Sequence, residues 1–232
     1  MAVIWNPSVR KYVGIVIPIS MSGYVVVGFG VCPDTNGPKL VKVSVDEISS
    51  MWVVEVFMLS TRVWKAVYMG APFKSCYLIW NQVFVNGVIY FHAYDDINLD
   101  WGVRSNFIIL FDLKSEKFGE VCLPKRLLDA PLLVVANVNE LLSSLEYYHA
   151  DETFVCDVWM RKDGANKTFS KIYTIKVEGK SLLHRVLGFR NNGEVVIELE
   201  DDNNHEFRIE VYDPSSGHFN GVGINGKRGT YV

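Results

Sequence analysis

The sequence lacks features that several large classes of protein require. Its 232 residues include only four cysteines, none in a C-x-x-C pair, so neither a zinc module nor a dense disulfide framework is expected. An excess of one charge is also missing, because 23 Lys and Arg stand against 26 Asp and Glu, which disfavours a dedicated nucleic-acid binder. We therefore expect free thiols in a reducing compartment and no nucleic acid as partner.

Segments for export or membrane insertion are missing as well. The N-terminus has no basic stretch followed by an apolar run, so no signal peptide is predicted. Residues 13–31 carry no charge, but several glycines and Pro18 interrupt them. Two strands with a turn near 18–23 explain this segment better than a membrane span. We expect a soluble protein of the cytoplasm or nucleus that contacts no membrane.

Apolar and aromatic residues, by contrast, are plentiful, at 49% and 13% of the chain, and exclude a disordered protein. Two aromatic residues flanking a polar turn occur five times, about every 50 residues. The five pairs are Trp5 and Tyr12, Phe57 and Trp64, Phe111 and Phe118, Trp159 and Phe169, and Tyr212 and Phe219. A period of about 50 residues is typical of kelch-type propeller blades, which have four strands each.

The rest of each period predicts further strands. Residues 83–91 contain two β-rich runs around Asn86-Gly87, a strong hairpin signal. Residues 132–148 could pass for a helix, and we assign strands there because of the period. The predicted fold is all-β: a propeller-like array of four-stranded antiparallel blades at about 25–67, 82–121, 132–175 and 186–224, after a half-blade of strands at 2–6 and 10–17. A β-sandwich is the alternative, but it would not require the period.

The predicted half-blade has no inner pair of strands. After residue 224 the chain offers enough residues for one short strand at most. We therefore expect one domain, 1–232, whose ring is incomplete or gapped. Because an unpaired strand edge favours pairing with other chains, the isolated chain is expected to self-associate, and restoring an upstream segment is expected to cure it.

Several short motifs follow one another in a fixed order along the chain. They are Trp5-Asn-Pro-Ser-Val-Arg-Lys-Tyr12, Gly28-Phe-Gly30, Val54 to Leu59, Val85-Asn-Gly87, Phe111 to Pro124, Val158-Trp-Met160 and Tyr212-Asp-Pro214. In this order they resemble the F-box-associated domain of plant F-box proteins, over essentially the whole chain. The double glycine of true kelch repeats is missing, because His92-Ala93 stands there in the second blade.

The resemblance implies a protein-interaction domain without enzymatic activity. It would be similar to the substrate-recognition module of an SCF-type E3 ubiquitin ligase, which acts in ubiquitin-dependent protein degradation. No F-box pattern precedes Trp5, so binding of a Skp1-type adaptor is expected only if an upstream F-box exists. Two alternatives stay open: a truncated orphan or decoy scaffold that binds a target without ubiquitination, and a propeller hydrolase or oxidase.

No motif predicts a catalytic centre, a cofactor or a metal ion. Gly28-Phe29-Gly30 lacks the third glycine of a dinucleotide loop and favours a bulged inner strand. The five histidines show no metal-binding spacing, so structural or surface roles are expected for them. Residues 201–206 are acidic but lack the spacing of a calcium loop, which favours a solvated loop.

Charge is divided between two kinds of loop. Loops joining the second and third strands of the predicted blades are acidic, whereas turns joining the third and fourth are basic, as at Arg10, Arg62, Lys114 and Arg161. Antiparallel blades would place these two sets on opposite faces. The longest acidic loop, 95–105, also contains a tryptophan, a typical interface anchor. We predict a partner-binding surface for a basic target protein, formed by Asp95, Asp96, Leu99, Asp100, Trp101, Asp201 and Asp202. The alternative, that these charges only solvate the loops, stays open.

Overall fold

A computed structural model describes residues 1–18, 23–46, 51–71, 73–74, 76–94, 105–150, 153–162, 168–177, 181–201 and 206–227. Strands β1 (Ala2–Asn6) and β2 (Lys11–Ile15) form a two-stranded sheet, the half-blade. Four antiparallel meanders follow, named blades 1 to 4. They consist of β3 (Gly23–Cys32), β4 (Gly37–Asp46), β5 (Trp52–Met58) and β6 (Val63–Gly70); β7 (Tyr77–Val85), β8 (Val88–Tyr94), β9 (Asn106–Asp112) and β10 (Lys117–Val121); β11 (Leu132–Val138), β12 (Leu141–Ala150), β13 (Thr153–Arg161) and β14 (Phe169–Lys176); and β15 (Ser181–Phe189), β16 (Val195–Asp201), β17 (Glu206–Asp213) and β18 (His218–Lys227).

This architecture confirms the predicted fold class, four blades and a half-blade. The segment that could have been a helix forms β11 and β12, and a single short helix, α1 (Lys125–Leu128), joins blades 2 and 3 within the described residues. The inner strands β7 and β15 begin about five residues earlier than expected. Register shifts after Leu78 and after Leu183 interrupt the alternation of inward and outward side chains there. The sequence pattern therefore does not indicate a strand at the first residues of β7 and β15.

The aromatic repeat has a structural cause in the hairpin that ends each sheet. In four of the five repeats the two aromatics are direct cross-strand partners. Ring centroids lie 5.2 Å apart for Phe57 and Trp64, 5.0 Å for Phe111 and Phe118, and 4.9 Å for Tyr212 and Phe219. In blade 3 Trp159 pairs with Lys171 instead, after a register shift and a longer turn. The period therefore records a cross-strand aromatic pair, which stabilises each hairpin.

The turns inside these hairpins share one backbone conformation. The residue two positions before the second aromatic has a positive φ in four hairpins, at Arg10, Arg62, Glu116 and Gly217. In two of these turns an aspartate accepts backbone hydrogen bonds: Asp112 from Ser115 at 2.6 Å, and Asp213 from Ser215 at 2.9 Å. Such left-handed turns match the twist of paired strands. Local sequence thus specifies the turn in these hairpins.

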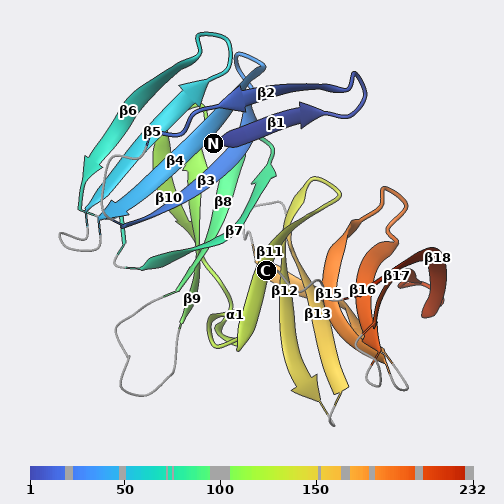
Figure 1. The fold of residues 1–232 in the computed structure, drawn as a ribbon. Helices are drawn as coiled ribbons and strands as arrows, with labels where there is room; N and C mark the ends of the chain where they lie inside the picture. The colour runs from blue at the N-terminus through green and yellow to red at the C-terminus, as the bar shows by residue number, and fades with distance from the viewer. Residues whose placement is uncertain are drawn as a thin grey trace.

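The blades pack side by side in chain order as an open array (Figure 1). Inner strands contact one another along the series β3, β7, β11 and β15. Four hydrophobic clusters join the half-blade to blade 1, blade 1 to blade 2, blade 2 to blade 3 and blade 3 to blade 4. No such cluster among the described residues joins blade 4 to the half-blade. The sheets are therefore not closed into a ring, as the sequence led us to expect.

Gly28 and Gly30 mark the closest approach between blades 1 and 2. A Cβ at Gly30 would lie 2.3 Å from the Phe84 ring, and one at Gly28 would lie 2.7 Å from Ile89 Cγ2. The predicted bulge is wrong, because β3 pairs with β4 in unbroken register from Gly23 to Cys32. The two glycines serve interblade packing, since any larger side chain would displace the β7–β8 hairpin.

Candidate partner-binding surface

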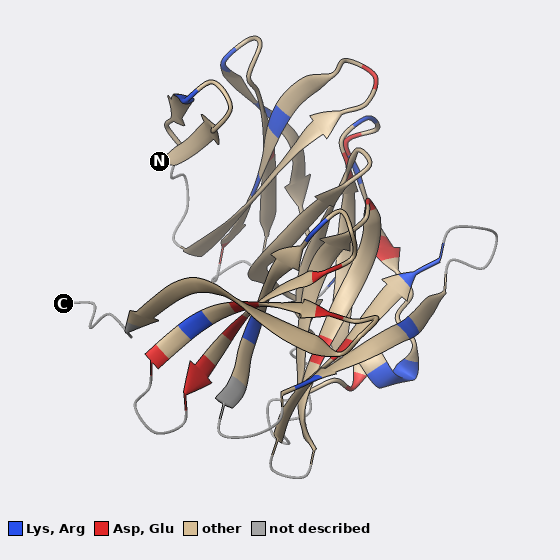
Figure 2. Ribbon diagram, turned by 90° about the vertical axis from the view of Figure 1, so that its right-hand side faces the viewer, with Lys and Arg blue, Asp and Glu red and all other residues tan. Residues whose placement is uncertain are grey.

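The predicted acidic surface falls mostly on loops that the structure does not describe. Asp95, Asp96, Leu99, Asp100, Trp101 and Asp202 lie outside the described residues. Asp201 is described: it ends β16 and is partly exposed. Figure 2 shows acidic positions gathered at this end of blade 4, where β16 ends and β17 begins. The surface as a whole thus stays a prediction, and Asp201 is the one residue of it that the structure describes.

The opposite strand ends carry the turns predicted to be basic. Arg62 and Lys114 are exposed there, and Arg161 ends β13 at the same end of its sheet. The turns between first and second strands share this end, and one of them supplies Asp34, which pairs with Lys114 at 2.9 Å. The basic character of this face is therefore weaker than the third-to-fourth-strand turns alone suggested.

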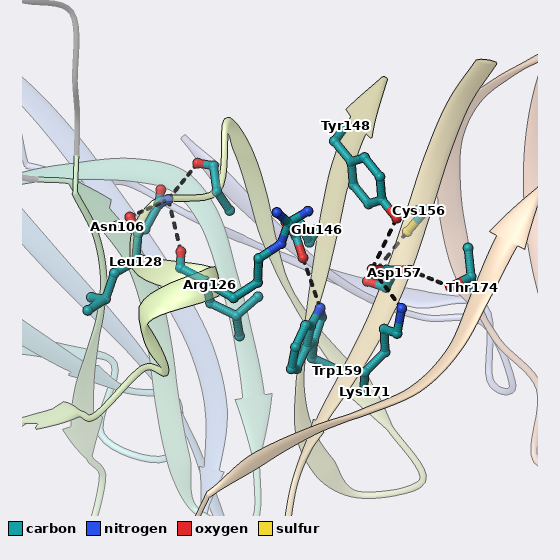
Figure 3. Close-up of polar contacts among 12 residues, drawn as sticks. Asn106, Arg126, Leu128, Glu146, Tyr148, Cys156, Asp157, Trp159, Lys171 and Thr174 are labelled. Carbon is teal, nitrogen blue, oxygen red and sulfur yellow. Dashed lines mark hydrogen bonds and ion pairs between the residues drawn. The ribbon is translucent and has the colours of Figure 1, made fainter. Parts of the chain in front are cut away.

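The base of the 95–105 loop is held by a buried polar network. Tyr94 and Asn106, which flank the loop, are cross-strand partners at the ends of β8 and β9. Asn106 Nδ2 donates to the carbonyls of Leu127, Leu128 and Ala130 at 2.8–3.2 Å, so it fixes the end of α1 (Figure 3). Because Asn106 Nδ2 is the donor, Oδ1 accepts from His92 Nε2, 2.9 Å away. Burial lowers the pKa of His92, which keeps this ring neutral.

A second part of the network links α1 to blade 3. Arg126 of α1 places Nε 2.6 Å from Glu146 Oε1, and Trp159 Nε1 donates to Glu146 Oε2 at 3.1 Å. Glu146 is fully buried on β12. Burial raises its pKa, although Arg126 and Trp159 partly oppose the shift. The ion pair therefore joins blades 2 and 3 through the helix (Figure 3).

Asp157 on β13 is the direct cross-strand partner of Glu146 and is also buried. Its carboxylate accepts from Tyr148 and from Lys171, each at 3.3 Å, and from the hydroxyl of Thr174 (Figure 3). Two like charges facing each other across a sheet would repel, so each needs partners of its own. These contacts give both carboxylates structural partners in the space between blades 2 and 3.

Sequence reasoning missed this network and the helix within it. A signal was present, because Glu146 and Asp157 interrupt apolar runs on two adjacent predicted strands. Charged residues at inward positions are rare unless paired. Within the described ranges, no three His, Cys, Asp or Glu side chains converge as a metal site would require. All four cysteines are free thiols, as predicted.

Comparison with known proteins identifies the family. The model of the F-box associated beta propeller domain matches residues 1–230. The chain belongs to this family. The F-box-associated propeller is a protein-interaction module of F-box proteins. A protein of Arabidopsis thaliana that is named as an F-box protein is 25% identical over 147 residues, which are 62% of this chain and 45% of the relative. The match thus spans less than half the length of that relative.

Solved structures align with this chain at low sequence identity. TolB from Acinetobacter baumannii aligns with a TM-score of 0.49 and 12% identity, over 86% of this chain and 43% of its own. The β-propeller domain of the Trilobed protease from Pyrococcus furiosus aligns with a TM-score of 0.42 and 9% identity, over 87% of this chain and 68% of its own.

None of the described segments contains a helix of the length and hydrophobicity needed to cross a bilayer.

Proposed function

We propose that this F-box-associated domain selects target proteins for an SCF-type ubiquitin ligase and has no enzymatic activity of its own. The observation that carries the proposal is the family match across residues 1–230. Contact with a Skp1-type adaptor would come from an F-box joined upstream. The domain would work as one unit, 1–232, in the cytoplasm or nucleus.

The contact we propose is the acidic loop surface, and its target is a protein with a basic surface. The hydrogen bonds of Asn106 support this proposal, because they hold the residue that directly follows the 95–105 loop against the end of α1. Asp201, at the end of β16, would extend the same acidic edge. Complementary charge would raise the rate of encounter, and Trp101 would supply the apolar anchor.

Replacing the anchor tests this contact. Tagged chain and its Trp101→Ala variant are expressed in plant cells, and cross-linked proteins are identified by mass spectrometry. We expect the variant to lose a common set of targets while its unfolding free energy changes by less than about 1 kcal/mol. Trp80→Ala is the control, because Trp80 is 78% exposed on β7 and should leave capture unchanged. If the wild type and both variants capture the same proteins, the 95–105 loop is not the contact.

Target turnover separates the ligase from a decoy scaffold. The chain is fused behind an F-box, and the half-lives of the captured proteins are followed after translation is blocked. A substrate receptor shortens these half-lives, and Trp101→Ala abolishes the effect. Unchanged or longer half-lives would favour the decoy.

A further inference from the structure

A groove of about 580 Å³ lies between the outer strands of blades 1 and 2. One wall is β6 and the other is the turn leading into β10. Its lining residues are Lys65, Ala66, Val67, Tyr68, Phe73, Ser115, Glu116, Lys117 and Phe118. Both walls consist of consecutive residues, so the edges of the strands rather than their faces line the groove.

Both strands end their sheets, which leaves backbone groups available along the walls. In blade 1 the strand order is β3-β4-β5-β6, and in blade 2 it is β10-β9-β8-β7. An unpaired edge is a template for an added strand. The β6 edge is the longer one, since it spans Val63–Gly70, against Lys117–Val121 for β10.

Aromatic rings form the apolar part of the groove. Phe118 packs against Trp52 at 5.6 Å between ring centroids and against Tyr68 and Phe73 at 6.2 Å each. Because Trp52 is buried, this group of rings is anchored in the core between blades 1 and 2. Tyr68 and Phe73 are both partly exposed and can accept an apolar side chain.

Lysines dominate the charge of the groove. Glu116 is its one acidic lining residue, and it is paired with the nearly buried Lys39 at 3.0 Å and with Lys65 at 3.4 Å. Burial raises the pKa of Glu116, but the two lysines outweigh this effect and lower it. Lys117 is exposed and makes no ion pair with the described residues. Among the described lining residues the groove is therefore positive, and Lys117 is a cation without an ion-pair partner there.

We propose that this groove binds an extended acidic peptide segment of another protein. The peptide adds as a strand to the β6 edge, seats one aromatic or aliphatic side chain between Tyr68 and Phe73, and places carboxylates beside Lys65 and Lys117. Edge pairing selects an extended backbone, and the two lysines select the acidic sequence. The proposal needs no F-box and no contact with residues 95–105, so it goes beyond the proposed function.

Peptide display on the intact chain tests it. A random library of ten-residue peptides is selected against the wild type, and enriched peptides are measured by fluorescence anisotropy. We expect peptides rich in Asp and Glu around one large apolar residue. Lys65→Glu combined with Lys117→Glu should weaken their binding at least tenfold, whereas Lys176→Glu, at an exposed lysine on β14, should leave it unchanged.

Two further measurements keep this test decisive. Lys117→Glu alone breaks no ion pair among the described residues, so it should lower affinity without changing the melting temperature, even if the double variant folds poorly. Trp101→Ala should bind the peptides as the wild type does, whether or not the acidic loop binds a target. Selected peptides without acidic bias, or binding that survives Lys117→Glu, would overturn the proposal.

Discussion

The interface between blades 1 and 2 and the interface between blades 2 and 3 are built differently. The centre of the first consists of apolar side chains such as Val43, Val54, Ile89 and Phe91, all of which are inaccessible to solvent. The interface between blades 3 and 4 is similar, with Val158, Ile175 and other apolar side chains at its centre. Burial of this apolar surface is the main source of stability.

The interface between blades 2 and 3, here named the polar seam, adds buried polar groups to its apolar cluster. His92, Asn106, Glu146 and Asp157 are all buried there, and α1 lies between the blades. A paired buried charge contributes little net stability, but it is costly to leave unpaired, so it fixes geometry. The molecule therefore consists of two pairs of blades, each with an apolar centre at its interface, joined by the polar seam.

The largest expected effect is in an apolar interface. Phe91→Ala should lower the free energy of unfolding by about 3–5 kcal/mol, because the ring is fully buried between blades 1 and 2 and leaves a cavity. Phe29→Ala is the control, since Phe29 is 43% exposed and should cost less than about 1 kcal/mol. Urea denaturation of both variants gives the values. Equal losses would mean that this interface is not a stabilising core.

A smaller effect is expected in the polar seam. Asn106→Ala removes four hydrogen bonds and takes this partner from His92 Nε2 and from the carbonyls of Leu128 and Ala130, which should cost about 2–3 kcal/mol. The exposed Asn192 accepts one backbone hydrogen bond, and Asn192→Ala should change stability by less than about 0.5 kcal/mol. If Asn106→Ala costs as little as its control, the seam does not depend on this clamp.

The pH dependence of stability distinguishes the seam further. Because the folded pKa of Glu146 is raised, the folded state holds this proton at pH values where the unfolded state has lost it. Stability should then fall as pH rises from the ordinary pKa of glutamate through the raised one. Glu146→Gln should remove this pH-dependent contribution to stability. It should lower the free energy of unfolding at pH 7 by no more than about 2 kcal/mol, because the half-exposed Arg126 can still be hydrated. Chemical denaturation of both proteins at several pH values measures the difference, and a constant difference would contradict the assignment.

The smallest effect on stability is expected at the half-blade, whose outer face is not covered by any segment that the structure describes. Trp5 and Tyr12 are 63% and 73% exposed there, and among the described strands β1 pairs with β2 alone. We expect the chain to self-associate, and Trp5→Ser with Tyr12→Ser to reduce association while costing less than about 1 kcal/mol of stability. Sedimentation velocity over a range of concentrations measures this. A monodisperse wild-type monomer with a cooperative melt would show that the open array needs no cover.

The sequence was sufficient to predict the blades because their signal is local and repeated. Each aromatic pair reflects one hairpin, so strand number, order and approximate bounds could be read from positions such as Phe57 and Trp64. The half-blade followed from the same count, because Trp5 and Tyr12 form the first aromatic pair and belong to a two-stranded sheet.

The sequence signals two charged residues on adjacent strands, but their partners in the seam could not be predicted, because they depend on how the blades pack. Glu146 by itself suggests a surface position, and its burial depends on Arg126, which arrives from a four-residue helix without an apolar period. The groove could not be predicted for the same reason. Lys65 and Lys117 are far apart in sequence and line one groove only because β6 and the turn into β10 form its two walls. Adding up the charges of each kind of loop also could not show that Lys114 forms an ion pair with Asp34, which lies in a turn of another kind.

Hydrogen–deuterium exchange on the intact chain tests most directly whether the seam is a structural unit distinct from the apolar interfaces. In the wild type the amides of Leu127 and Leu128, bonded to Pro124 O, should exchange faster than those of Val43 and Val54. Asn106→Ala should accelerate α1 and the adjoining β11 at least tenfold and leave β4 and β5 unchanged. If the variant accelerates all four elements equally, the seam is not a separate unit and the account of two blade pairs is wrong.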